Sequence, residues 1–168
     1  RTLSLIFYGD LDITEIKDKP RARAPVTTAI VSSRKYDDML AYVGREAKAG
    51  NQSYFVCPKI EEDEEGSVMS VTELFDELKN RLPSVRFALL HGKMKDKEKA
   101  EIMQDFKAKK FDCLVSTTVI EVGVDVPDAT IMIVYNAERF GLSQLHQLRG
   151  RVGRGSKQSY CFLLLGAD

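Results

Sequence analysis

Residues 113–135 read CLVSTTVIEVGVDVPDATIMIVY, with two short apolar runs, CLVS (113–116) and IMIVY (131–135), on either side of a more polar segment. Four further apolar runs of strand length occur elsewhere in the chain, at Thr28–Ser32, Ser53–Cys57, Arg86–Leu90 and Tyr160–Leu165. Short continuous apolar runs are typical of strands that are buried on both faces of a parallel sheet. The pattern predicts an α/β fold with a mostly parallel central sheet and helices on both faces.

Amphipathic stretches separate these runs and predict the helices. The expected helices cover residues 36–47, 70–82 and 96–109, with a fourth starting near Ser143. Ser70 and Glu73 have the spacing of a capping box at the start of the second helix, and Pro83 ends it.

The composition is that of one globular domain, with 168 residues, 43% of them apolar and 30% charged, and equal numbers of acids and bases. It excludes collagen, a disordered chain and a small disulfide scaffold. No apolar run approaches the roughly 18 residues of a membrane span, so a cytoplasmic protein is expected. Cys57, Cys113 and Cys161 each lie in an apolar run and are expected to be buried, reduced thiols.

The chain begins without Met and in the middle of a pattern, so it is expected to be part of a longer protein. Residues 1–25 are interpreted as a connector and residues 26–168 as the domain itself.

Charge is unevenly distributed along the chain. Residues Glu61–Glu77 contain eight acids and no bases, whereas Lys79–Lys110 contains ten bases and four acids. Arg139–Lys157 adds five bases and no acid. Most such runs are solvated faces, but the arginine segment calls for a further explanation.

The stretch Gln147–Gly155 reads QLRGRVGRG, with three arginines within six positions separated by two glycines. Each glycine would cost about 1 kcal/mol in a helix interior. Arg151 and Arg154 are three residues apart, so on a helical turn both would project from one face. Such a pair could clamp the oxygens of a transferring phosphoryl group. The alternative is a surface ion-pair cluster, although no acid lies nearby in the sequence.

The stretch Ser116–Pro127 follows directly on the expected strand at 113–116. The carboxyl ends of strands are where open α/β sheets bind ligands. Thr117 and Thr118 offer hydroxyls and backbone N–H groups to a phosphate, Gly123 permits close backbone approach, and Asp125 offers oxygens to a ribose or a cation. The same stretch could simply be a strand followed by a turn.

A third candidate segment, His91-Gly92-Lys93, comes at the end of another expected strand. Its basic side chains and backbone amides suit a nucleic-acid phosphate, although a single histidine is more often structural. The chain has no G-x-x-x-x-G-K-[ST] phosphate loop, and neither Asp63-Glu64 nor Asp76-Glu77 follows a buried strand as a magnesium-binding pair would. We therefore expect no metal site here, and arginines alone cannot hydrolyse a nucleotide.

These residues resemble the motifs of superfamily 2 helicases. Gln147–Arg154 resembles motif VI, Thr117–Asp125 resembles motif V, and Leu89–Gly92 resembles the segment between motifs IV and V. A closer resemblance, to a bacterial branch-migration helicase, is carried by Val56–Glu62, Thr117–Pro127 and Asn136–His146, and the similarity spans nearly the whole chain. Residues 1–12 resemble the stretch that follows motif III in that group.

The resemblance implies the second RecA-like motor domain of an ATP-dependent DNA helicase that remodels replication forks and Holliday junctions in DNA repair and recombination. ATP and Mg²⁺ would be bound mainly by the first motor domain, so this chain alone would not hydrolyse ATP. The full protein would act, usually as a monomer, on branched or duplex DNA at the bacterial nucleoid.

The resemblance also implies roles for individual residues. Arg154 would be the arginine finger, with Arg151 beside it on the phosphates and Gln147 coupling nucleotide to DNA. Gly123 and Asp125 would contact the nucleotide. The DNA track would be formed by Thr117, Thr118, His91, Gly92 and Lys93.

Three other interpretations remain open at this point. One is the related transcription-repair coupling translocase, which tends to have Tyr at the position of His146 and Thr at the position of Val122. The second is a nucleic-acid-binding domain that ignores nucleotide. The third is a protein-interaction module that uses the acidic segment after Ile60.

Overall fold

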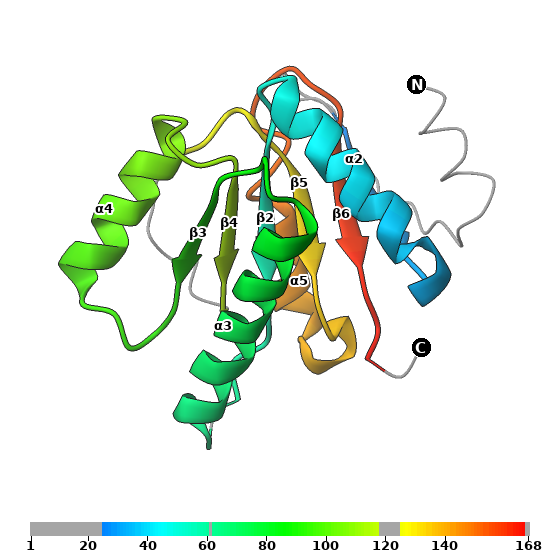
Figure 1. Cartoon of the computed structure of the whole chain (residues 1–168). Coiled ribbons are helices and arrows are strands. Elements are labelled where there is room, and N and C mark those ends of the chain that lie inside the picture. The colour runs from blue at the N-terminus through cyan, green and yellow to red at the C-terminus, as the bar shows by residue number, and fades with distance from the viewer. Residues whose placement is uncertain (1–24, 61, 118–124, 167–168) are drawn as a thin grey trace.

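The sheet is parallel throughout, as the short apolar runs predict. The structure is a computed structural model and describes residues 25–60, 62–117 and 125–166. Within this part of the chain, six strands form one sheet in the order β1-β6-β5-β2-β4-β3, and every neighbouring pair is parallel (Figure 1). The strands are β1 (Val26–Ile30), β2 (Gln52–Val56), β3 (Phe87–Leu90), β4 (Cys113–Ser116), β5 (Ala129–Val134) and β6 (Ser159–Leu163).

Helices cover both faces of the sheet, and the predicted α/β architecture is confirmed. Helices α2 (Tyr36–Lys48) and α3 (Glu64–Arg81) lie on one face, in front of the strands in Figure 1. Helices α4 (Asp96–Lys107) and α5 (Leu142–Arg149) pack on the opposite face. Two short 3₁₀ turns, η1 (Ser33–Lys35) and η2 (Ala137–Arg139), complete these elements.

Alternate residues of each central strand supply the two cores. Phe55 of β2 packs with the α2 and α3 core, whereas its neighbour Tyr54 packs with the α4 and α5 core. Burial of every residue of β2, β4 and β5 explains why these strands read as apolar runs rather than as alternating patterns. All three cysteines are buried and free, as expected.

Helix α3 begins six residues before the position that the capping box predicts. Its N-cap is Asp63, whose carboxylate accepts a hydrogen bond from the Gly66 N–H at 3.0 Å. Glu64 and Glu65 form the acidic first turn, which the helix dipole favours. The prediction of a start at Ser70 is therefore wrong, because the acidic residues that resemble a loop in the sequence belong to the helix.

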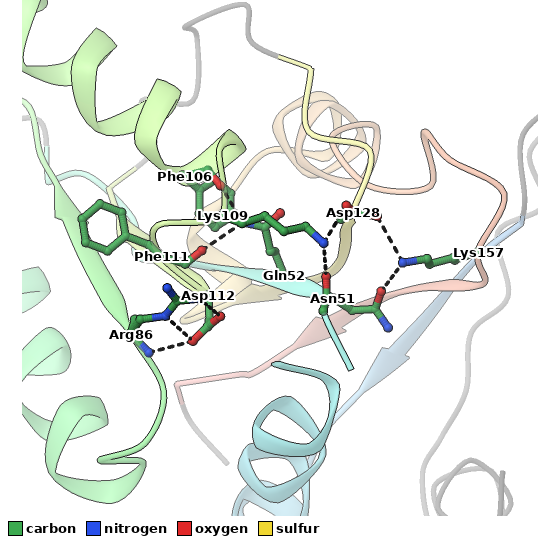
Figure 2. Close-up of polar contacts among 10 residues, drawn as sticks. Asn51, Gln52, Arg86, Phe106, Lys109, Phe111, Asp112, Asp128 and Lys157 are labelled. Carbon is green, nitrogen blue, oxygen red and sulfur yellow. Dashed lines mark hydrogen bonds and ion pairs between the residues drawn. The ribbon is translucent and has the colours of Figure 1, made fainter. Parts of the chain in front are cut away.

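A polar network joins four loops at the amino edge of the sheet (Figure 2). Asp128, which precedes β5, forms ion pairs with Lys109 at 2.9 Å and Lys157 at 3.1 Å. Lys157 also donates a hydrogen bond to Asn51 Oδ1. The buried Gln52 side chain also donates hydrogen bonds to the carbonyl oxygens of Phe106, in the last turn of α4, and Phe111, in the segment that follows. These contacts link the starts of β2, β4, β5 and β6.

Replacing Asp128 by Asn should destabilise the chain by about 0.5–1 kcal/mol near neutral pH, because it weakens two partly exposed ion pairs, each of which contributes about 0–1 kcal/mol. Lys109 and then Lys157 hold the pKa of the Asp128 carboxyl below its usual range. Because the folded pKa is the lower one, this stabilisation is present above the unfolded pKa and is lost as pH falls through the folded pKa. In urea unfolding, the free energies of unfolding of the wild type and of Asp128→Asn should become equal at acidic pH.

Asp105→Asn is the matched control, since Asp105 makes one exposed ion pair with Lys110 at 3.5 Å. It should change the free energy of unfolding by less than about 0.5 kcal/mol. An Asp128→Asn difference that persists unchanged below both pKa values would contradict the electrostatic account.

Candidate nucleotide and nucleic-acid site

The arginine segment lies in a loop rather than on a helical turn. Helix α5 ends at Arg149 with Gly150 as its C-cap, and Gly153 has a φ of 77°. A left-handed backbone of this kind cannot continue a helix. The expectation that Arg151 and Arg154 share one face of a helical turn is therefore wrong. We call residues 150–155 the arginine loop.

Asp125 is the acidic partner of Arg154. The Arg154 Nη1 to Asp125 Oδ1 distance is 3.5 Å, and the Arg154 Nε–H also donates to the Gly150 carbonyl oxygen at 3.2 Å. No acid lies near these arginines in the sequence, but the fold brings the distant Asp125 close to Arg154, so an ion pair of the kind that the alternative interpretation expected is present. Both side chains of the pair are about half exposed, at 43% and 56%, so the ion pair faces solvent.

The charges of Arg151, Arg154 and Asp125 all influence the pKa of the Tyr54 hydroxyl. Burial raises the pKa of Tyr54 to about 12, the two arginine charges oppose the rise, and the Asp125 charge adds to it. All three charges therefore lie within electrostatic range of one buried phenol. Sequence reasoning missed Tyr54, which resembles any other core residue of a strand.

The third arginine of the segment has a different environment. Arg149 is buried, and its Nε–H donates to Thr28 Oγ1 at 2.9 Å while Nη2 donates to the Val26 carbonyl oxygen at 2.8 Å. Gln147 lies two residues earlier on α5 and is exposed. The structure thus separates one buried arginine from two in the loop that follows.

The candidate nucleic-acid residues lie at neighbouring strand ends. In the register of β3 and β4, Leu90 pairs with Ser116, so His91 and Thr117 come next on adjacent strands. Thr117 is buried, and within the described residues its hydroxyl has no hydrogen-bond partner. Thr118 and Gly123, the remaining candidates of this stretch, lie outside the described residues.

Two acids of α3 face the His91–Lys93 segment. Lys93 Nζ lies 3.4 Å from Glu65 Oε2, and a Cβ at Gly92 would come within 3.3 Å of Glu64 Oε2. The His91 Nδ1 accepts a hydrogen bond from the Lys93 N–H at 3.2 Å. Lys93 is therefore exposed and basic, but it has an acidic neighbour that sequence reasoning assigned to a loop.

The two groups of candidate residues lie toward opposite edges of the sheet. Thr117 follows the carboxyl end of β4, whereas Asp125 comes four residues before the amino end of β5. Because β4 and β5 run in the same direction, the chain between them must return from one edge to the other. The stretch Ser116–Pro127 is therefore not one carboxyl-edge site, and only its first part lies there.

Among the described residues, no group of three or more His, Cys, Asp or Glu side chains could hold a metal ion. None of the helices in the same part of the chain is long and apolar enough to cross a membrane.

Comparison with known families matches residues 34–156 to the helicase conserved C-terminal domain. The ATP-dependent DNA helicase RecG of Aquifex aeolicus is 49% identical over 165 residues, which is 98% of this chain and 21% of that protein. RecG of Thermotoga maritima is 46% identical over 167 residues, or 99% of this chain and 21% of that protein. The chain thus spans about a fifth of the length of these relatives.

Solved structures agree with this similarity. RecG bound to a three-way DNA junction aligns with a TM-score of 0.74 and 42% identity, over 98% of this chain and 21% of that one. Domain 2 of the DEAD-box helicase Mss116p, bound to an RNA duplex, aligns with a TM-score of 0.62 over 83% of this chain and 53% of that one, at 18% identity. The second likeness is one of fold alone. The resemblance to a bacterial DNA helicase is confirmed, since these relatives are named ATP-dependent DNA helicase RecG.

Replacing Gly153 by Ala should destabilise the chain by about 1–2 kcal/mol, because an L side chain is strained at its positive φ. Gly44→Ala within α2 is the matched control, since its Cβ would meet Leu82 Cδ2 at an ordinary 3.6 Å. That control should stabilise by roughly 0.5–1 kcal/mol. Urea unfolding measures both variants, and equal effects would argue against the described conformation of the arginine loop.

Proposed function

This chain belongs to the family of helicase conserved C-terminal domains, in its RecG-like branch, and from that membership we propose that it is the second motor domain of an ATP-dependent DNA helicase. The domain comprises residues 26–168, and residues 1–25 are the connector together with the tail of the first motor domain. The whole protein remodels branched DNA such as replication forks and Holliday junctions, at the bacterial nucleoid and as a monomer.

The observation that carries this proposal is the half-exposed Arg154, which pairs with Asp125 and lies in the same loop as Arg151. A guanidinium ion donates fixed, paired hydrogen bonds that match phosphate oxygens. Arg154 is thus suited to act as the arginine finger on a triphosphate that another domain holds, with Arg151 next to it. Gly123 and Asp125 contact the nucleotide in this proposal, and Gln147 couples the nucleotide to DNA.

ATP is the substrate, and it and Mg²⁺ are bound mainly by the first motor domain. In this division, the present chain supplies arginine side chains to the phosphates. Binding of ATP between the two domains favours their closed arrangement, because only the closed state adds the arginine contacts. The chain alone is therefore inactive as an ATPase.

The DNA track of this domain is formed by the carboxyl-edge residues His91, Gly92, Lys93, Thr117 and Thr118. The exposed Lys93 and the backbone of Gly92 suit phosphate contacts, which fix position without reading sequence. Glu64 and Glu65 stand beside this segment, so DNA phosphates must replace the Glu65 contact of Lys93. Junction preference then belongs to other domains of the full protein.

A nucleotide-independent DNA-binding domain is the rival of a different class. The basic segment of α4 and the arginine loop would give such a domain affinity for phosphates, with a steep dependence on salt. The rival predicts that Arg154 serves DNA affinity, whereas the motor proposal assigns it to ATP hydrolysis. Substitution of Arg154 separates the two.

In the full-length protein, Arg154→Ala should lower the DNA-stimulated kcat for ATP by on the order of 10³-fold or more, as loss of an arginine finger does elsewhere. ATP binding should remain measurable, because the first motor domain supplies most contacts. Steady-state ATPase assays and nucleotide titration measure the two effects. Arg45→Ala, an exposed arginine on α2, is the control and should retain turnover. Unchanged turnover in Arg154→Ala would overturn the finger assignment.

Lys93→Ala should weaken DNA binding and reduce the slope of log affinity against log salt by about 1, the effect of one lost phosphate contact. Fluorescence anisotropy over a salt series measures the slope. Lys48→Ala at the end of α2, where the amino edge lies, is the control and should leave the slope unchanged. Equal slopes for wild type and Lys93→Ala would remove Lys93 from the DNA track.

A further inference from the structure

Arg149 is the one arginine of the segment that the proposed phosphate contacts do not use. Only 4% of its surface is exposed, although burying a guanidinium ion is costly unless hydrogen bonds replace its water. Its Nε–H donates to Thr28 Oγ1 at 2.9 Å and Nη2 donates to the Val26 carbonyl oxygen at 2.8 Å. These bonds tie the last residue of α5 to β1, which is 121 positions away in sequence.

The arginine loop starts directly from this anchored residue. Gly150 follows Arg149, and its carbonyl oxygen accepts the hydrogen bond from the Arg154 Nε–H at 3.2 Å. The orientation of the Arg154 guanidinium thus depends on where the Gly150 carbonyl lies. That carbonyl is one peptide away from the Arg149 anchor, so a series of contacts runs from Thr28 through Arg149 and Gly150 to Arg154.

The other end of the arginine loop is also held in place. A Cβ at Gly155 would lie 3.0 Å from the Pro127 carbonyl oxygen, so the two backbones are in close approach. Pro127 is two residues after Asp125, the ion-pair partner of Arg154. With the far end packed on this turn, Arg149 determines the position of the near end.

We propose that Arg149 is a positioning residue that fixes the Gly150 carbonyl through its bonds to β1 and thereby orients Arg154 for ATP hydrolysis. This inference rests on the proposed function of Arg154. Arg149 itself touches no substrate, because it is buried between α5 and β1. Its contribution is geometric, and catalytic groups tolerate displacements of only about 0.5 Å.

Two substitutions in the full-length protein test this role. Arg149→Met keeps an unbranched side chain but removes the donors, and Thr28→Val removes only the Oγ1 acceptor. A misplacement of about 1 Å can cost on the order of 10²-fold in rate, so Arg149→Met should lower the DNA-stimulated kcat by that order and Thr28→Val by about 10-fold. The KM for ATP should change by less than about 3-fold, since ATP is held mainly by the first motor domain.

Thr28→Ser retains the hydroxyl and should restore kcat to within about 2-fold of wild type, while Arg45→Met controls for loss of an arginine elsewhere. Thermal unfolding of each variant establishes that it is folded at the assay temperature. If Arg149→Met does not fold, Thr28→Val and Thr28→Ser decide the question alone.

Unchanged kcat in a folded Thr28→Val, or no recovery in Thr28→Ser, overturns the positioning role. A lower melting temperature with unchanged kcat also overturns it, because Arg149 would then be a structural residue only. Arg154→Ala is assayed beside these variants. If Arg154→Ala also retains turnover, the proposed function fails; if Arg154→Ala alone loses it, only the role of Arg149 fails.

Discussion

The parallel pairing of all six strands is the constraint from which the rest of the described structure follows. Each strand must be followed by a connection that crosses a face of the sheet, so both faces are covered and the strands between them are apolar. Charged and polar side chains of the connecting loops then gather at the two edges of the sheet. At the amino edge they form the network around Asp128, and at the carboxyl edge of β3 and β4 they include His91 and Thr117 (Figure 2 shows the amino-edge network).

The same constraint explains why residues that are adjacent in sequence motifs separate in space. Thr117 and Asp125 lie eight positions apart, yet one follows β4 and the other precedes β5, so they face different edges. Conversely, Asp125 and Arg154 are distant in sequence but meet as an ion pair. In the proposed motor domain, the residues assigned to DNA and those assigned to the nucleotide are separated in the same way.

Much of the fold could be predicted from sequence because its signals are local. Each apolar run lies within two residues of an observed strand, and the start of α4 at Asp96 was predicted correctly. The start of α3 was missed because acids in a first helical turn resemble a solvated loop until Asp63 is seen to cap them. The candidate site was harder to predict from the sequence. Nothing local distinguishes Arg149 from Arg151 and Arg154, since burial against β1 depends on a contact between the two ends of the domain.

The difference in burial gives Arg149 and Arg154 opposite properties. The Arg154–Asp125 pair is exposed, and exposed ion pairs contribute only about 0–1 kcal/mol. A triphosphate, which carries more charge and presents several oxygens, can displace Asp125 at little cost. Arg149 cannot exchange partners in this way, because a buried guanidinium removed from its acceptors would leave its N–H groups without hydrogen bonds, at a cost of about 1–3 kcal/mol or more for a charged group. The segment therefore combines a fixed arginine with an exchangeable one, and the fixed arginine limits the directions in which the exchangeable one can move.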